Sequence, residues 1–154
     1  MVTYEKGKVI LRQGEKGDCM YYVHSGVIGI YKDYGTNHAN KIAEVHEGEY
    51  LGEMELIEMK ERSATAVVLS DTAELEVLSD NDYLDMVSHN PVQVFLMMKT
   101  LTERLRKTTA DYNSACQTVY ETVMCVREDI EPSPELIENQ KRFSGVYLAN
   151  IGKD

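Results

Sequence analysis

The sequence lacks any apolar run close to the ~20 residues that a membrane-spanning helix needs, so we expect no membrane contact. Residues 1–6 lack the apolar core of a secretory signal, which favours a cytoplasmic location. Cysteine is scarce, and Cys19, Cys116 and Cys125 form no CxxC pair. An odd, scattered set of thiols is typical of reduced cysteines in a cytosol.

Basic residues are also in short supply: 16 Lys and Arg stand against 26 Asp and Glu, for a net charge of −10. Because Lys and Arg supply most of the affinity for nucleic acid, we expect no direct nucleic-acid partner. The four histidines are scattered and form no His-x-His pair. This argues against an enzyme of the metal-binding cupin class, and we expect no catalytic residue, no metal and no resident cofactor.

Residues 1–78 consist mostly of short segments typical of β-strands, separated by turns. The clearest strands are expected at 9–11, 21–23, 27–31, 41–45, 64–69 and 74–78. Their spacing of roughly ten residues predicts a sandwich or a jelly-roll-like β-roll. A polar hairpin loop is expected at 33–40, and a short helix at 79–87 with Ser79 or Asp80 as its N-cap.

From Pro91 onward the pattern changes to that of one long helix. Apolar or small residues recur in steps of three and four, at Met98, Leu101, Leu105, Thr108, Tyr112, Ala115, Val119, Thr122 and Val126. This heptad pattern predicts a helix over 91–126, about 54 Å long. We expect its apolar face to pair with a second copy in a parallel homodimer; the alternative is that the helix folds back on its own domain.

The remaining segment, 127–154, is short and acidic. Pro132 and Pro134 end the long helix, and 136–143 is long enough for one short helix. Four apolar residues are candidates to pack back on the domain: Phe143, Val146, Tyr147 and Leu148.

The most informative stretch runs from Gly52 to Val67. Gly52 opens a tight turn in which backbone N–H groups can converge on an anion. Glu53 is placed to accept a hydrogen bond from a sugar hydroxyl, and Arg62 can fork onto a phosphate. Ser63 adds a hydroxyl donor. The set suits a ligand with a ribose at one end and a phosphate at the other.

This stretch resembles the phosphate-binding cassette of cyclic-nucleotide-binding domains. Segments 7–18 and 21–31 are similar to the family's opening strands and turns, and 48–53 to the lead into the cassette. Roughly residues 1–126 follow the family. The order of the glycines, rather than any one of them, carries the resemblance.

The resemblance implies an α+β fold: a cyclic-nucleotide-binding β-roll (a double-stranded β-helix or jelly roll) followed by a long dimerisation helix. The domains expected are the β-roll at 1–90, the helix at 91–126 and the tail at 127–154. Residues 61–64 are similar to the matching stretch of bacterial catabolite activators. Those regulators carry a winged helix-turn-helix about twice as long as this tail, so we expect no DNA-binding domain here.

The resemblance also implies the site. Glu53 would meet the ribose 2′-hydroxyl, Arg62 and Ser63 the cyclic phosphate, and the amides of Glu55 and Leu56 would close the cradle. Residues 104–109 are similar to a helix segment that meets adenine in catabolite activators, although Thr108 and Thr109 are alternatively plain surface threonines. The expected binding residues are Gly52, Glu53, Met54, Glu55, Leu56, Arg62, Ser63, Thr108 and Thr109. The expected ligand is cyclic AMP, with cyclic GMP as the alternative.

Glu55 departs from the family pattern, which has a small residue at this position. A carboxylate ~4 Å from the phosphate would cost about 1–4 kcal/mol, and almost nothing if it turned outward or paired with Lys60. Glu61 stands where a proline is common, and Met59 where a glycine is common.

Together these features predict a cyclic-nucleotide sensor without enzymatic activity. With no output domain expected, an unknown protein partner would read its signal. The alternative is a degenerate, non-binding β-roll that serves as a dimerisation or interaction module.

Overall fold

The structure is a computed structural model that describes residues 1–144. The chain divides into two compact units, one over Met1–Thr100 and the other beginning at Leu101.

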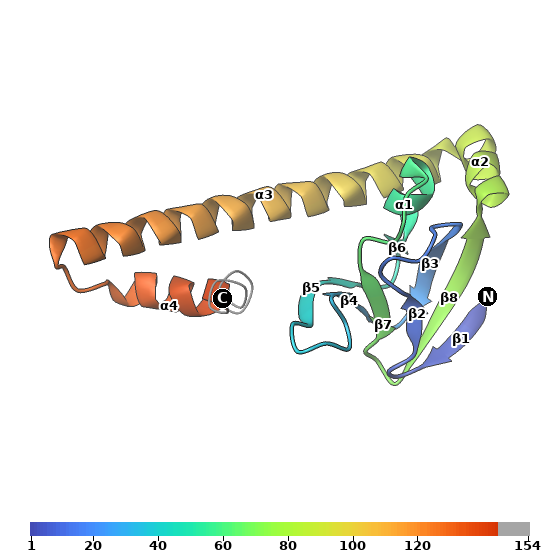
Figure 1. Cartoon of the computed structure of the whole chain (residues 1–154). Helices are drawn as coiled ribbons and strands as arrows, with labels where there is room; N and C mark the ends of the chain where they lie inside the picture. Colours follow the sequence, from blue (N-terminus) through green and yellow to red (C-terminus); the bar gives the residue numbers. More distant parts are fainter. Residues whose placement is uncertain (145–154) are drawn as a thin grey trace. The chain divides into compact units, whose positions relative to one another are not determined.

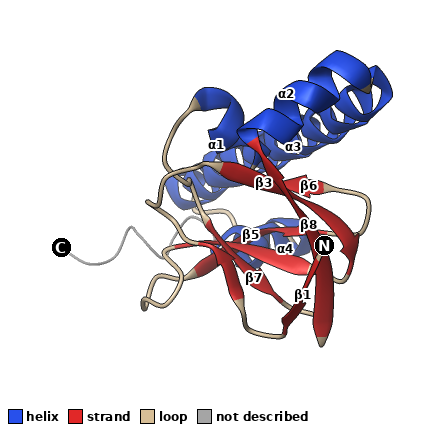
Figure 2. Cartoon of the chain, turned by 90° about the vertical axis from the view of Figure 1, so that its right-hand side faces the viewer, coloured by secondary structure: helices blue, strands red, loops and turns tan. Residues whose placement is uncertain are grey.

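The first unit is a β-roll of two antiparallel four-stranded sheets (Figure 2). The sheet orders are β1-β8-β3-β6 and β2-β7-β4-β5. The strands are β1 (Val2–Glu5), β2 (Val9–Leu11), β3 (Cys19–Ser25), β4 (Ile28–Lys32), β5 (Asn40–Val45), β6 (Tyr50–Leu51), β7 (Thr65–Val68) and β8 (Thr72–Ser79). The predicted β-roll is therefore confirmed.

The core of the roll lies between the two sheets. Its buried members come from both sheets: Leu11, Val23, Ile28, Val45, Leu51, Ala66, Val68, Ala73 and Leu75. In β8 the buried residues alternate with more exposed ones, as expected for a strand with one face on a core. Sequence patterns missed β1, which is almost wholly exposed, and β6, which has only two residues.

Two short helices complete the first unit. Helix α1 (Glu53–Glu58) follows β6, and α2 (Asp80–His89) follows β8. Helix α2 begins with a capping box in which Ser79 and Asp82 satisfy each other's backbone N–H groups. The predicted helix after Ser79 is confirmed, with that serine as its N-cap.

Helix α3 (Pro91–Glu128) is the long helix, and α4 (Pro134–Phe143) returns alongside it (Figure 1). Within the second unit, Gln140 Nε2 donates to Thr122 Oγ1 at 2.8 Å, and Arg142 Nη2 lies 2.7 Å from Asp111 Oδ1. Leu136 is 3% exposed. Thus α4 packs on α3 through polar bonds and an apolar contact face.

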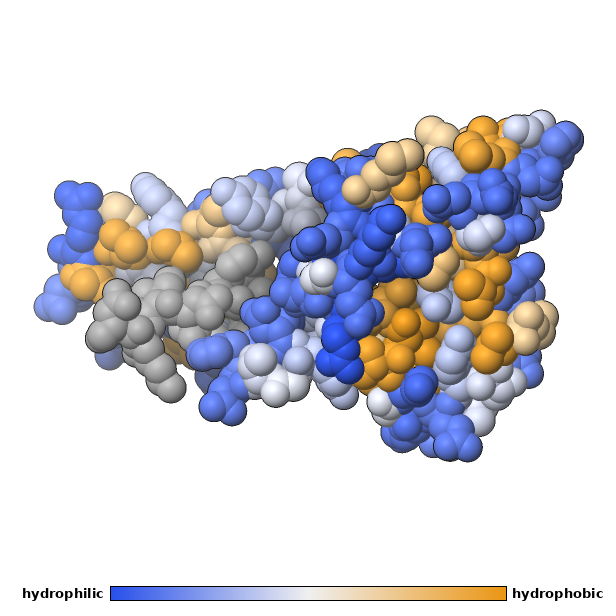
Figure 3. All heavy atoms as spheres, turned by 45° about the vertical axis from the view of Figure 1, so that its right-hand side comes forward, coloured by the Kyte–Doolittle hydropathy of each residue, from blue (hydrophilic) through white to orange (hydrophobic). Residues whose placement is uncertain are grey.

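Several large apolar side chains remain exposed on both units. Figure 3 shows hydrophobic patches (orange) between hydrophilic side chains (blue) on one face. Within residues 1–144, no helix is long and apolar enough to cross a bilayer. The tail residues expected to pack back at 146–148 lie outside the described residues.

Candidate functional site

The cassette predicted from the sequence is built from β6, α1, the loop after α1 and the start of β7. Gly52 caps α1 with a φ of 78°, in the left-handed region that favours glycine. A Cβ at this position would lie 2.7 Å from Arg62 Nη1. Glycine is therefore required here both by the backbone conformation and by the close approach of the arginine.

Backbone hydrogen bonds fix the loop that carries Arg62. The Gly14 N–H donates to the Arg62 carbonyl at 2.9 Å, and the Arg62 N–H donates to the Glu15 carbonyl at 2.7 Å. The Gly17 N–H also donates to the Lys60 carbonyl. The turn between β2 and β3 thus holds the end of the cassette as a short strand would.

The Arg62 side chain is buried and aimed inward, with only 4% of the residue exposed. Its Nη1 donates to the Gly52 carbonyl at 2.8 Å and its Nη2 to the Cys19 carbonyl. A guanidinium carries a positive charge in proteins. The site therefore contains a fixed positive charge whose planar donor groups suit a carboxylate or a phosphate.

Glu53 is the first residue of α1 and is 2% exposed. Its neighbours in the cassette differ in burial: Met54 is 53% exposed, whereas Leu56 is 7% exposed. The cassette thus buries both an acidic group and a basic group, Glu53 and Arg62, at its two ends.

Glu55 points into the cassette. Its Oε1 accepts hydrogen bonds from the Ser63 backbone N–H at 3.1 Å and from Ser63 Oγ at 2.5 Å. Its Oε2 lies 3.8 Å from Arg62 Nη1. Burial favours the neutral acid, but the Ser63 hydrogen bonds, the Glu55 amide and the Arg62 charge outweigh it and lower the pKa of the carboxyl.

Glu55 therefore adopts neither of the two arrangements that would keep its charge away from a phosphate. It neither turns outward nor pairs with Lys60, whose ammonium lies 2.7 Å from Glu58 instead. The sequence could not show this, because the direction of Glu55 depends on Ser63, eight residues away, and on close packing against Gly17. A Cβ at Gly17 would lie 2.7 Å from the Glu55 Cβ.

The other departures from the family pattern also have structural counterparts. Met59 ends α1 in the left-handed region with a φ of 55°, and is 91% exposed. Glu61 forms an isolated antiparallel bridge with Lys16. Position 59, where the family commonly has a glycine, therefore adopts a left-handed backbone conformation that favours glycine.

Thr108 and Thr109 belong to the second unit, whereas the cassette belongs to the first. Both are exposed residues of α3 in the second unit. The Thr109 hydroxyl donates to the Leu105 carbonyl one turn back, at 2.9 Å.

Two contributors to the site were not singled out from the sequence. The Cys19 carbonyl accepts from Arg62, and Gly17 leaves room for Glu55. A backbone acceptor has no sequence signal. Gly17 was recognised only as part of a turn.

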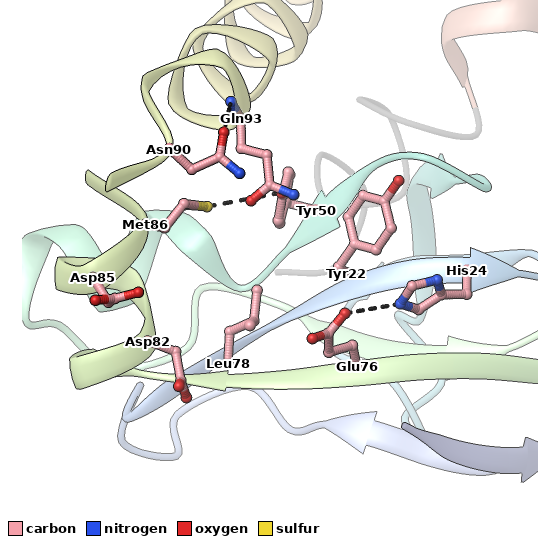
Figure 4. Close-up of a pocket in the computed structure, with 10 residues that line it drawn as sticks. All are labelled: Tyr22, His24, Tyr50, Glu76, Leu78, Asp82, Asp85, Met86, Asn90 and Gln93. Atoms are coloured by element: carbon pink, nitrogen blue, oxygen red, sulfur yellow. Dashed lines mark hydrogen bonds and ion pairs between the residues drawn. The ribbon is translucent and has the colours of Figure 1, made fainter. Parts of the chain in front are cut away.

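A second recess, of about 490 Å³, lies between the sheet that contains β3 and β8 and the helices α2 and α3 (Figure 4). Its acidic lining includes Glu76, Asp82 and Asp85. His24 Nε2 lies 2.9 Å from Glu76 Oε2. The recess shares no residue with the cassette, and its carboxylates would repel a phosphate, so we place the candidate site at the cassette.

No group of three or more His, Cys, Asp and Glu side chains in residues 1–144 is arranged to hold a metal ion.

The fold and the site define a class: a β-roll domain in which a buried arginine and the exposed serine next to it provide donors for an anion beside a buried glutamate. Comparison with known proteins agrees. The model of the cyclic nucleotide-binding domain matches residues 1–90, and the chain belongs to this family.

Similar proteins include a cyclic AMP receptor protein of Thermus thermophilus, 36% identical over 104 residues, or 68% of this chain and 48% of that protein. A cAMP-dependent protein kinase regulatory subunit of Dictyostelium discoideum is 36% identical over 46% of this chain and 21% of its own length. The chain thus spans about half or less of these relatives.

Solved structures show the same likeness. The catabolite activator protein of Thermus thermophilus aligns with a TM-score of 0.63 and 28% identity, covering 85% of this chain and 64% of that one. The regulatory domain of Toxoplasma gondii PKA, solved with cAMP, aligns with a TM-score of 0.54 and 26% identity, covering 66% and 38%. The predicted family and fold class are confirmed.

Proposed function

We propose that this chain is a cyclic-nucleotide sensor that binds cyclic AMP in preference to cyclic GMP and has no catalytic activity of its own. The observation that carries the proposal is the buried Arg62, held by the Gly52 and Cys19 carbonyls beside Ser63. A buried guanidinium with an adjacent hydroxyl suits a cyclic phosphate, which bears one negative charge. Two of the similar proteins, a cyclic AMP receptor protein and a cAMP-dependent protein kinase regulatory subunit, favour adenine.

In this proposal Glu53 accepts from the ribose 2′-hydroxyl, while Arg62 and Ser63 bind the phosphate. Thr108 and Thr109 serve the adenine base, one of them from a second copy of the chain. Their exposed hydroxyls and their place on the long helix support this role.

The second copy would pair through α3. The residues of the predicted heptad pattern form the seam of this pairing. Four of them, seven residues apart, are exposed in the second unit: Leu105 at 68%, Tyr112 at 59%, Val119 at 60% and Val126 at 79%. Helix α4 packs beside this row, on the side of two other positions of the predicted pattern: Ala115 is 7% exposed, and Thr122 Oγ1 accepts a hydrogen bond from Gln140 Nε2. An exposed apolar stripe at heptad spacing suits a parallel coiled coil.

The signal would pass to a protein partner rather than to DNA, because the chain has a net charge of −10. Coupling is reciprocal, so a partner that prefers the liganded form would also tighten nucleotide binding. A mobility-shift assay at low salt, the condition most favourable to DNA binding, tests this step. A clear shift would contradict it.

One observation favours the alternative of a non-binding interaction module: the donors of the cassette already serve Glu55. Calorimetry with cyclic AMP and cyclic GMP separates the two. Heat of binding that saturates at or below millimolar cyclic AMP supports the sensor. A folded protein that binds neither nucleotide at that concentration supports the module.

A further inference from the structure

We propose that Glu55 is an internal substitute for the phosphate, so that a cyclic nucleotide enters the site only by displacing the Glu55 carboxylate. The inference rests on the proposed function, since it concerns the same cassette and the same ligand.

The first argument is that the donors are shared. The groups expected to bind the phosphate are Arg62, the Ser63 hydroxyl and the amides of Glu55 and Leu56, and all but the Leu56 amide face the Glu55 carboxylate. Ser63 Oγ and its N–H donate to Glu55 Oε1, and Arg62 Nη1 lies 3.8 Å from Oε2. The Glu55 amide also faces this carboxylate. A carboxylate and a cyclic phosphodiester each present two oxygens and one negative charge, so one can replace the other at these donors.

The second argument is that the cassette is complete without a ligand. Glu55 is 9% exposed and Arg62 is 4% exposed. Among residues 1–144, every buried side-chain nitrogen and oxygen has a hydrogen-bond partner. A buried anion site that awaited its ligand would leave donors unsatisfied, which is costly. Here the carboxylate supplies the missing acceptor.

The third argument concerns space. The turn at Gly17 closes over Glu55, because a Cβ there would lie 2.7 Å from the Glu55 Cβ and 3.0 Å from the Lys60 carbonyl. Gly17 therefore blocks one side of Glu55, and a displaced carboxylate has to move away from Ser63. Displacement breaks two hydrogen bonds and one ion pair, and the phosphate must replace all three.

Competition between these two anions sets the affinity. If both stayed within ~4 Å, their repulsion would weaken cyclic-nucleotide binding between about fivefold and a thousandfold. Adenosine has no phosphate and does not compete with Glu55. The carboxylate is therefore a selectivity device that acts against the charged part of the ligand only.

The test is calorimetry of the full chain with cyclic AMP and with adenosine. The variants are Glu55→Ala, which empties the position, and Glu55→Gln, which keeps the shape and removes the charge. Glu58→Gln is the matched control: it lies on the same helix, is exposed, and pairs only with Lys60 among the ion pairs of the cassette. Circular dichroism verifies that each variant is folded.

We expect cyclic AMP to bind Glu55→Gln and Glu55→Ala at least fivefold more tightly than the unaltered protein. The affinity of these variants for adenosine should rise no more than twofold, or adenosine binding should stay undetected. Glu58→Gln should bind cyclic AMP with the affinity of the unaltered protein. If the unaltered protein binds cyclic AMP and both Glu55 variants bind it equally or less tightly, the inference is wrong while the proposed function stands. If neither the unaltered protein nor any folded variant binds millimolar cyclic AMP, the proposed function itself fails.

Discussion

Arg62 and Gly52, at the two ends of the cassette, are joined directly: Arg62 Nη1 donates to the Gly52 carbonyl oxygen at 2.8 Å. The same guanidinium reaches the Cys19 carbonyl on β3. One side chain thus ties together β3, the start of α1 and the loop after α1. The arginine has a structural role in addition to its expected role in binding phosphate.

The contact predicts that Gly52→Ala destabilises the fold. A Cβ would meet Arg62 Nη1 at 2.7 Å, and alanine also disfavours the left-handed φ of 78°. Gly35→Ala is the matched control, because its φ is 84° and nothing lies within 4 Å of its Cβ. Urea denaturation should show Gly52→Ala to be less stable than the control by about 1–3 kcal/mol, typical of overpacking. If both variants lost the same free energy of unfolding, the contact between the new Cβ and Arg62 would have no energetic cost.

The Glu55 carboxyl predicts a pH dependence of stability. Its pKa is lowered from 4.5 in the folded state, so the folded form prefers the charged carboxylate. This contribution is therefore fully present above pH 4.5 and is lost as pH falls through the lower, folded-state pKa. The positively charged group beside the Glu55 carboxylate is Arg62, whose Nη1 lies 3.8 Å from Oε2.

Urea denaturation between pH 6 and pH 3 checks this, with Glu55→Gln as the comparison. The free energy of unfolding should fall less steeply in the variant, since glutamine does not titrate. The other carboxyl groups are present in both proteins, so their contributions to the pH dependence cancel in the comparison. Parallel pH profiles would show that the Ser63 hydrogen bonds do not depend on the charge of Glu55.

Met59 predicts a stabilising substitution. Its φ of 55° costs a non-glycine residue about 1–2 kcal/mol, and its side chain is 91% exposed. Met59→Gly should therefore stabilise by about 0.5–1 kcal/mol after the entropy cost of glycine. Met54→Gly, inside α1, should instead destabilise by about 1 kcal/mol. Thermal or urea unfolding checks both predictions. A lower free energy of unfolding for Met59→Gly would contradict the backbone strain at Met59.

The seam of α3 predicts that the protein is a homodimer. Charged residues introduced into the seam should disrupt this homodimer. Leu105→Lys and Val119→Lys place like charges opposite each other in a parallel pair, and should shift the protein toward monomer in sedimentation at tens of micromolar. Ala110→Lys is the control, because it lies on the same helix at an exposed position away from the seam. A monomer before any substitution, or equal effects in all three variants, would count against the seam.

Much of the fold was predictable, and the reasons are local. The strands between 9 and 78 are short apolar runs separated by turns, and α2 begins at Ser79, whose capping partner Asp82 stands three residues later. The exceptions are β1 and β6, which exist because β8 and β3 pair with them rather than through a pattern of their own. Pairing of this kind has no local signature.

The site was predictable in its members but not in its arrangement. Arg62, Ser63 and Glu53 stand out as residue types at a characteristic spacing. The inward turn of Glu55 arises from contacts with Ser63, Gly17 and Arg62, which only the folded chain brings together. The sequence left open whether Glu55 would repel a phosphate or turn away from it, and the structure places its carboxylate on Ser63 and beside Arg62.

The most direct measurement is the affinity for cyclic AMP of the unaltered protein and of Arg62→Ala, by calorimetry, with folding verified by circular dichroism. Arg62→Lys is the companion variant, which keeps a charge but loses the planar fork. The account predicts saturable binding at or below millimolar nucleotide, weakened in Arg62→Ala by about 2–5 kcal/mol, or from thirtyfold to several thousandfold. Binding of equal strength in folded Arg62→Ala would place the nucleotide elsewhere and contradict the account.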